Sequence, residues 1–171
     1  MKSVILTLLL LLFAAQSSAE THSLDKLGAD QSQFSVRVDK SARIMFLLQD
    51  NRVIKWYRIA LGANPKGHKI REGDKRTPEG NYTLDFINEK SRFYRSIRIN
   101  YPNSTDIARA ERLGVDPGGQ IMIHGQKNGI NMEHDEARTD NWTDGCIAIS
   151  NDEMDEFLSL IPVGTPIEID W

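Results

Sequence analysis

From residue 34 onward, apolar and polar residues alternate in short runs, and this two-residue period predicts β-strands. Phe34, Val36 and Val38 show the alternation first. Two apolar runs on either side of a turn-like break at residues 49–52 predict a hairpin. These two runs and the later strands expected on the same grounds cover residues 43–48, 53–61, 82–86, 96–100, 121–124, 146–149 and 166–169.

Two segments have the period of a helix instead. The first covers residues 104–113, where Ser104 and Asp106 provide a cap and Gly114 ends the helix. The second begins at residues 150–153, where a polar cap and early acidic residues suit a helix N-terminus. Its apolar face consists of Met154, Phe157, Leu158 and Ile161, and it is ended by Pro162 and Gly164. The pattern therefore predicts one mainly β domain with a few short helices.

The N-terminus has the composition of a secretory signal. Lys2 supplies a positive start, residues 4–15 form an apolar stretch, and residues 17–19 are small enough for cleavage. The apolar stretch is short for a transmembrane helix, which needs about 20 residues, so cleavage near Ala19 is favoured over an uncleaved anchor. We therefore expect an exported protein with a signal peptide at 1–19, a linker at 20–32 and a folded domain at 33–171, with no membrane span after cleavage.

Charge and cysteine content narrow the class of protein. The formal charge of the 171-residue chain is −3, and it becomes −4 when residues 1–19 leave, because they contain Lys2 and no acidic residue. A mildly acidic chain with dispersed basic residues argues against a nucleic-acid partner. Exported domains usually pair their cysteines, whereas this chain has one. That cysteine is an inert core residue, an intermolecular link or a reactive nucleophile.

The single cysteine, Cys146, starts an apolar run directly after a polar loop, and His124 ends an earlier apolar run. A thiol attacks carbonyl groups as thiolate, so it needs a base such as histidine. If the two strands are neighbours, the histidine and the thiol meet at the same end of the sheet. Gly145 would let substrate approach the backbone, whose N–H groups can form an oxyanion hole. The alternative is that Cys146 packs in the core and His124 makes an ordinary hydrogen bond.

A zinc site is a competing interpretation. The possible ligands are His68, His124, Glu133, His134, Asp135 and Cys146. They show neither an HExxH nor a CxxC spacing, so we expect no metal. A serine hydrolase is not indicated, since no GxSxG motif occurs. The polar segments 62–78 and 125–144 have the length and composition of functional loops.

Three motifs in order resemble the YkuD-type L,D-transpeptidase domain of bacterial cell walls. They are TPEGNY at residues 77–82, IMIHG at 121–125 and TDGCIAI at 143–149, followed by a helix and a GTPIEI strand. The resemblance covers about residues 33–171 and implies a catalytic domain with a β-sandwich-like mixed sheet. It also implies that Cys146 is the nucleophile and His124 the general base. Gly125, Thr143, Asp144 and Gly145 occupy the motif positions that would support them.

The resemblance further implies a substrate and a reaction. The substrate would be a peptidoglycan stem peptide, attacked at the diamino acid in position three, with loss of D-alanine and formation of a thioester. An amine, a lysine of a wall-attached lipoprotein, a free D-amino acid or water would then resolve the thioester. No cofactor is implied, and the site of action would be the periplasm or cell envelope. Transpeptidase, hydrolase and a non-catalytic wall-binding module all remain open at this point.

Two residues depart from the pattern of the family. Many members have histidine where this chain has Asp144, and arginine or asparagine where it has Ala148. Arginine there could hold a carboxylate with two hydrogen bonds, which alanine cannot do. Substrate contacts are therefore expected elsewhere, and the candidates are Arg76, Arg92, Arg95 and Tyr101. The GCIAI sequence is similar to a branch that includes a hydrolase releasing the outer-membrane lipoprotein from peptidoglycan.

Overall fold

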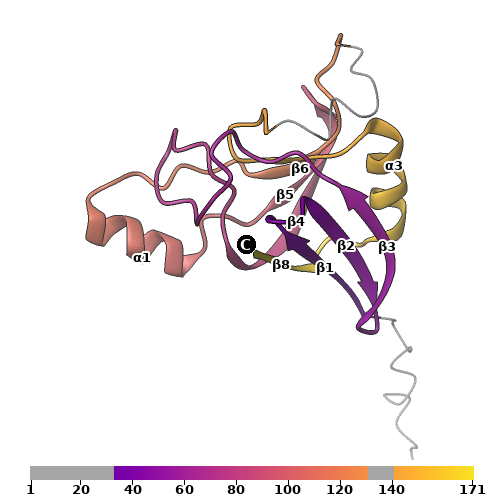
Figure 1. Cartoon of the computed structure of the whole chain (residues 1–171), viewed down its shortest axis with the longest axis horizontal. Helices are drawn as coiled ribbons and strands as arrows, with labels where there is room; N and C mark the ends of the chain where they lie inside the picture. The colour runs from indigo at the N-terminus through magenta and orange to yellow at the C-terminus, as the bar shows by residue number, and fades with distance from the viewer. Residues whose placement is uncertain (1–32, 131–140) are drawn as a thin grey trace, which may run out of the picture. The chain divides into compact units, whose positions relative to one another are not determined.

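The computed structural model describes residues 33–130 and 141–171. The expected signal peptide and linker lie outside the described residues. The described chain forms a curled, mixed, eight-stranded sheet in the order β3-β2-β1-β8-β4-β5-β6-β7, with two helices (Figure 1). The strands are β1 (Phe34–Asp39), β2 (Ile44–Gln49), β3 (Arg52–Arg58), β4 (Gly80–Ser91), β5 (Tyr94–Ile99), β6 (Met122–His124), β7 (Ile147–Ala148) and β8 (Pro166–Asp170). The helices are α1 (Ser104–Leu113) and α3 (Asn151–Leu160).

Strand β4 joins the two halves of the sheet. Its first residues pair antiparallel with β8, and the residues from Leu84 onward pair antiparallel with β5. The pairs β1–β8 and β6–β7 are parallel. Directly after β3, Ala60 exchanges two hydrogen bonds of 2.9 Å with Ala148 of β7. The strands at the two ends of the order are therefore linked, and the sheet curls around its own core.

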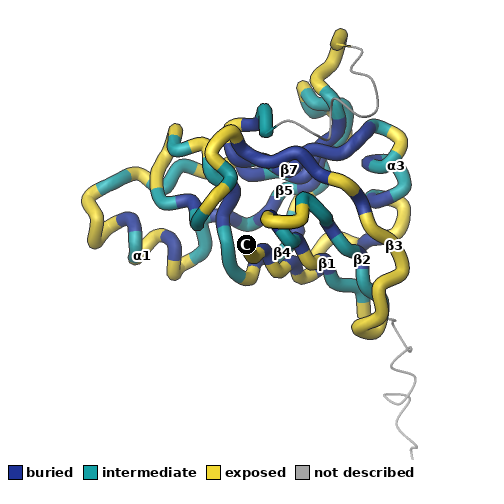
Figure 2. Tube along the Cα trace, viewed as in Figure 1, coloured by how far each residue is buried: buried dark blue, intermediate teal, exposed yellow. Residues whose placement is uncertain are grey.

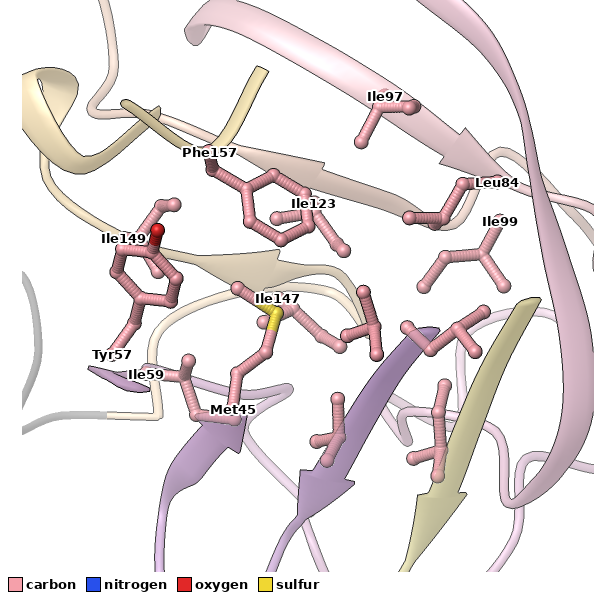
Figure 3. Packing of buried hydrophobic residues seen from close by; sticks show 14 of the residues in the cluster. Met45, Tyr57, Ile59, Leu84, Ile97, Ile99, Ile123, Ile147, Ile149 and Phe157 are labelled. Carbon is pink, nitrogen blue, oxygen red and sulfur yellow. The ribbon is translucent and has the colours of Figure 1, made fainter. Parts of the chain in front are cut away.

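The core lies inside this curl. Apolar side chains from β2, β3, β4, β5, β6, β7 and α3 point toward one another there (Figure 3). Tyr57 and Phe157 meet edge to face, with ring centroids 5.8 Å apart. Residues 147–150, which include β7, are all buried (Figure 2), although β7 itself has only two residues. The position of the short strand that follows Cys146 is therefore fixed by packing on all sides.

Both expected helices are present, with one correction at a cap. Helix α3 begins after Ser150, within the polar cap expected at residues 150–153, and the structure adds that Ser150 forms a capping box with Glu153. Helix α1 is capped by Asn103 rather than by Ser104, and Asp106 completes its capping box. Gly114 ends α1 in the left-handed conformation, at φ 64°. The correction arises because Asn103 stands in extended backbone, where its side chain reaches two N–H groups of the first turn.

The boundaries of β4 and β5 differ from those expected from the sequence, because pairing between the two strands determines where they end. Strand β4 extends to Ser91 and β5 begins at Tyr94, so the two form a longer hairpin than the apolar alternation indicated. Within residues 33–130 and 141–171, the chain has no helix whose length and hydropathy would let it cross a membrane.

Candidate active site

A cavity of about 440 Å³ opens beside Cys146. Its walls come from the β4–β5 hairpin, from β6 with Gln120 two residues before it, and from the loop that leads into β7. The lining residues are Asn88, Lys90, Ser91, Arg92, Phe93, Ser96, Gln120, Met122, His124, Trp142, Thr143, Asp144 and Cys146. Four of the residues singled out by sequence around the thiol thus share one cavity, namely His124, Thr143, Asp144 and Cys146.

The parallel pairing of β6 with β7 determines how His124 and Cys146 face each other. His124 is paired with Ala148, which stands two residues after Cys146, so the thiol is level with Met122. The two residues therefore do not meet at one end of the sheet, as the sequence suggested. They lie on the same face, since side chains two residues apart point the same way. The Met122 N–H donates to Cys146 Sγ over 3.4 Å, and the thiol donates to the Gln120 carbonyl oxygen at 3.6 Å.

The ring of His124 is held by one hydrogen bond and two aromatic neighbours. Its Nδ1 lies 2.7 Å from the Gly125 carbonyl oxygen, which can only accept, so Nδ1 carries the proton. The neutral ring then has its lone pair on Nε2. Phe93 stacks over the ring with centroids 4.5 Å apart, and Trp142 lies 5.6 Å away. The histidine is thus fixed in the tautomer that a general base requires.

Burial favours the neutral forms of both residues. It lowers the pKa of His124 to about 4, although the hydrogen bond to Gly125 opposes the shift. Burial also raises the pKa of the Cys146 thiol, and the charge of Asp144 adds to the rise. The Met122 N–H and the charge of Lys69 act in the opposite direction. At neutral pH the site therefore holds a thiol and a neutral imidazole rather than a preformed ion pair.

The loop before Cys146 is a tight turn closed by Thr143. The Thr143 hydroxyl donates to the Cys146 carbonyl oxygen at 2.7 Å and accepts the Gly145 N–H at 3.1 Å. Gly145 has a φ of +127°, and a Cβ there would lie 2.6 Å from the Arg76 carbonyl oxygen. A larger residue at 145 would therefore be strained and would collide with the backbone. The turn formed by Thr143 and Gly145 therefore determines the position of the Cys146 thiol.

A single asparagine fastens the hairpin that carries Phe93. The Asn128 side chain donates to the Ser91 carbonyl oxygen at 3.0 Å and accepts the Tyr94 N–H at 2.9 Å. Its backbone N–H donates to the Arg92 carbonyl oxygen at 3.0 Å. These three bonds join the hairpin tip to the segment that follows His124. The stacking of Phe93 on the imidazole is therefore supported from outside the cavity.

Comparison with known proteins places this domain. Residues 33–169 match the L,D-transpeptidase catalytic domain, YkuD. The chain belongs to this family. Among solved structures, the helical cell shape determining protein Pgp2 of Campylobacter jejuni superposes with a TM-score of 0.62 at 26% identity, covering 82% of this chain and 48% of Pgp2. An L,D-transpeptidase of Xylanimonas cellulosilytica superposes with a TM-score of 0.54 at 19% identity, covering 81% of this chain and 61% of the other. The mainly β, mixed-sheet fold expected for this YkuD domain is thereby confirmed.

Curated relatives of this YkuD chain carry names from the same family. YafK of Escherichia coli K12, whose name assigns it provisionally to the L,D-transpeptidases, is 30% identical over 107 residues, or 61% of this chain and 36% of YafK. YqjB of Bacillus subtilis strain 168, named in the same form, is 27% identical over 135 residues, or 78% of this chain and 69% of YqjB. The chain thus spans about a third of the length of YafK.

The substrate-binding candidates of the YkuD domain have different locations. Arg92 lines the cavity. Arg95 instead pairs with Glu89 and Asp155 on the hairpin and α3. Two further candidates also lie outside the cavity lining. The Arg76 guanidinium lies near the His68 carbonyl oxygen, and Tyr101 is buried with its hydroxyl donating to Pro117.

Three residues of the YkuD site were not singled out from the sequence. Trp142 could have been noticed, because an aromatic residue four positions before the cysteine is close by connectivity alone. Phe93 gave no local signal, since it reaches the cavity only through the β4–β5 hairpin. Lys69 is buried and donates to Asp74 at 2.9 Å, and its charge acts on Cys146. Its role depends on how the 62–78 segment packs.

The residues considered for zinc are dispersed. His68 does not line the cavity and lies beside Glu79 and Asp106. Glu133, His134 and Asp135 lie outside the described residues. In the part of the chain that the structure describes, no three histidine, cysteine, aspartate or glutamate side chains are grouped to hold a metal ion.

Proposed function

We propose that this YkuD domain is an exported cysteine enzyme that forms a thioester with peptidoglycan stem peptides. The observation that carries the proposal is the geometry at the cavity. The Cys146 thiol and the His124 ring line one cavity from the same face of the sheet, in a domain of the L,D-transpeptidase family. The aromatic neighbours of His124 keep it neutral and therefore able to accept a proton.

The proposed reaction has two steps that use the same pair of residues. In the first, Nε2 of His124 takes the thiol proton while Sγ bonds to the substrate carbonyl carbon. The C–N bond to the terminal residue then breaks, and the leaving amine receives the proton from the imidazolium. In the second step an acceptor loses a proton to His124 and attacks the thioester carbon, the C–S bond breaks, and Sγ takes that proton from the imidazolium to restore the thiol. The thioester preserves the acyl group for the acceptor, and no cofactor takes part.

The oxyanion formed in each step needs hydrogen-bond donors. The Gly145 N–H already donates to the Thr143 hydroxyl. We therefore assign the main donor role to the N–H of Cys146, whose orientation is set by the turn that Thr143 closes. In this proposal Thr143, Gly145 and Gly125 position the reacting groups, and Asp144 faces the substrate.

The acceptor is an amine in the transpeptidase form of this proposal. The second candidate is a hydrolase, in which water resolves the thioester, including one that releases a wall-attached lipoprotein. Position 148 favours this second form, because the arginine that many family members have there is replaced by alanine. Ala148 is fully buried, and both its N–H and its carbonyl group form hydrogen bonds with the backbone of Ala60. We place either reaction in the periplasm or cell envelope, because the N-terminus has the features of an export signal.

Replacement of the nucleophile tests the proposal. Cys146→Ala should lower turnover of purified muropeptides more than about 10³-fold, with little change in thermal stability, since one small side chain replaces another. The products are separated and weighed by mass spectrometry, with and without wall-attached lipoprotein in the substrate. New cross-links identify a transpeptidase, and shortened stems or released lipoprotein identify a hydrolase. Full activity of Cys146→Ala would overturn the proposal.

A further inference from the structure

One peptide group links His124 to the start of α3. Its carbonyl oxygen belongs to Gly125 and lies 2.7 Å from His124 Nδ1, which donates to it. Its N–H belongs to Gln126 and donates to Asn151 Oδ1 at 2.8 Å. The carbonyl and the N–H of a trans peptide share one plane and point in opposite directions. The imidazole and the Asn151 side chain therefore hold the same peptide group from its two sides.

The glycine at position 125 makes this arrangement possible. A Cβ there would lie 2.6 Å from Asn151 Oδ1 and 3.0 Å from Tyr94 Cβ, and the first distance is shorter than side-chain carbon atoms tolerate. Gly125 is not among the glycines with a positive φ, so its backbone conformation does not require glycine. The requirement is one of space, and the atom that occupies the space is the side-chain oxygen of Asn151.

Asn151 is the first residue of α3, but the cap of this helix does not depend on its side chain. Ser150 accepts the Glu153 N–H, and the Glu153 carboxylate accepts the Ser150 N–H, so these two residues form the cap. The Ile149 N–H donates to the His124 carbonyl oxygen at 3.0 Å, which joins the end of β6 to the residues before α3. The contact that the Asn151 oxygen makes is with the support of the imidazole.

Cys146 and Asn151 belong to one short segment. Residues 147–150 between them are all buried, and β7 within them pairs with β6. The nucleophile and the side chain that supports the base are thus fixed by the same packing. We propose that Asn151 is a positioning residue. Through the peptide group between residues 125 and 126, it holds the His124 ring with Nδ1 protonated and Nε2 available to the thiol.

Two physical effects produce this role. A peptide group that is fixed at its N–H cannot turn its carbonyl away from Nδ1, and the other tautomer would set the Nδ1 lone pair against the carbonyl oxygen. Hydrogen bonds in a chain also polarise one another, so the bond from Asn151 makes the Gly125 carbonyl a better acceptor for the imidazolium formed during the reaction. The inference rests on the proposed function, because it assigns His124 the role of the base.

The tautomer of His124 is measured by nitrogen NMR on the full chain with isotope-labelled histidine, without substrate. The signals of His124 are those that disappear in His124→Gln. We expect the Nδ1-protonated form to dominate in the unchanged chain, and a mixture of both tautomers in Asn151→Ala. Asn151→Ser, whose hydroxyl is too short to reach the Gln126 N–H, should give the same mixture. Asn100→Ala is the matched control, because the Asn100 oxygen accepts the Thr83 N–H at the same distance, 2.8 Å, outside the cavity lining.

Turnover of purified muropeptides provides the second readout. Asn151→Ala should lower kcat about 10- to 100-fold and change KM less than about twofold, because Asn151 does not line the cavity and acts only through the imidazole. Asn151→Asp keeps the accepting oxygen and should restore most of kcat. Asn100→Ala should keep both the rate and the tautomer, while its melting temperature falls about as much as that of Asn151→Ala.

The two readouts separate this inference from the proposed function. An unchanged His124 tautomer in Asn151→Ala and Asn151→Ser would overturn the positioning role, whatever the rate. A loss of kcat that Asn100→Ala shares would reveal a general loss of stability and would overturn it as well. A changed tautomer in a chain whose Cys146 forms no thioester with muropeptides would overturn the proposed function and leave the positioning of His124 standing.

Discussion

Two histidines in this domain have lowered pKa values and opposite surroundings. His68 sits among charged groups: its Nδ1 contacts the backbone of Glu79, and its Nε2 lies 3.2 Å from Asp106 Oδ1. Burial and the charge of Arg109 lower the pKa of His68. His124 sits among aromatic rings, with Nδ1 bonded to the backbone and no hydrogen bond from Nε2 to any of the residues 33–130 and 141–171.

The difference separates a histidine that connects elements from one that acts as the base in the proposed mechanism. The contacts of His68 tie the 62–78 segment to α1, because Asp106 also accepts from Tyr82 and completes the α1 capping box. A proton taken up there would change a network of fixed charges. The aromatic rings beside His124 restrict its orientation, and none of the described residues forms a hydrogen bond with its Nε2. Low pKa alone therefore does not identify a base; the deciding feature is what contacts the second nitrogen.

The largest effect on the acylation rate should come from substituting His124, and substitution of His68 provides the comparison. His124→Gln should lower the rate of acylation of Cys146 by about 10² to 10⁴-fold, because proton transfer is lost. Its melting temperature should change little. His68→Gln should instead destabilise the fold by about 1–3 kcal/mol, since buried polar partners lose a hydrogen bond, and acylation at 25 °C should be nearly normal. Stopped-flow acylation and thermal unfolding are measured on both variants, and a loss of rate in His68→Gln equal to that in His124→Gln would remove the distinction.

The sequence predicted the parts of this comparison that depend on near neighbours. Alternation at Val36 and Val38 and the polar helix start at residues 150–153 are local patterns, and both are present in the structure. The expected attachment of His124 and Cys146 to adjacent short strands also rests on local apolar runs. The parallel pairing of those strands was not predictable from such runs, because register depends on how distant segments pack.

The same reasoning explains the missed surroundings of the two histidines. Phe93 comes close to His124 only because β4 pairs with β5 and β5 pairs with β6, and no short sequence motif marks it. Lys40 is fully buried and donates to Gly67, Thr77 and Glu79. A lysine in the sequence gives no sign of such contacts. Residue types alone named His124 and Cys146 as candidates, whereas the surroundings of these residues are made by the fold.

The pH dependence of the reaction sharpens the comparison further. The pKa of His124 is held at about 4 by burial, so the imidazole stays neutral and competent well below its usual value of 6.5. Activity should therefore persist as pH falls through 6 and be lost only as pH falls toward 4. Phe93→Leu lets water reach the ring, so the pKa rises toward 6.5 and the acid limb of kcat/KM moves up by about one pH unit or more. Phe46→Leu, an aromatic residue on β2 outside the cavity lining, should leave that limb unchanged.

The smallest expected effect tests whether the aromatic cover of His124 is held from outside. Asn128→Ala removes two side-chain hydrogen bonds at the hairpin tip, those to Ser91 and Tyr94. A looser tip leaves Phe93 less often in place, so kcat should fall about three- to tenfold, with KM changed less. Asn128→Asp keeps the oxygen that accepts from Tyr94 and should retain part of the activity. The acid limb should move in the same direction as in Phe93→Leu, and a fall in kcat without that movement would show that Asn128 acts by another route than through the imidazole.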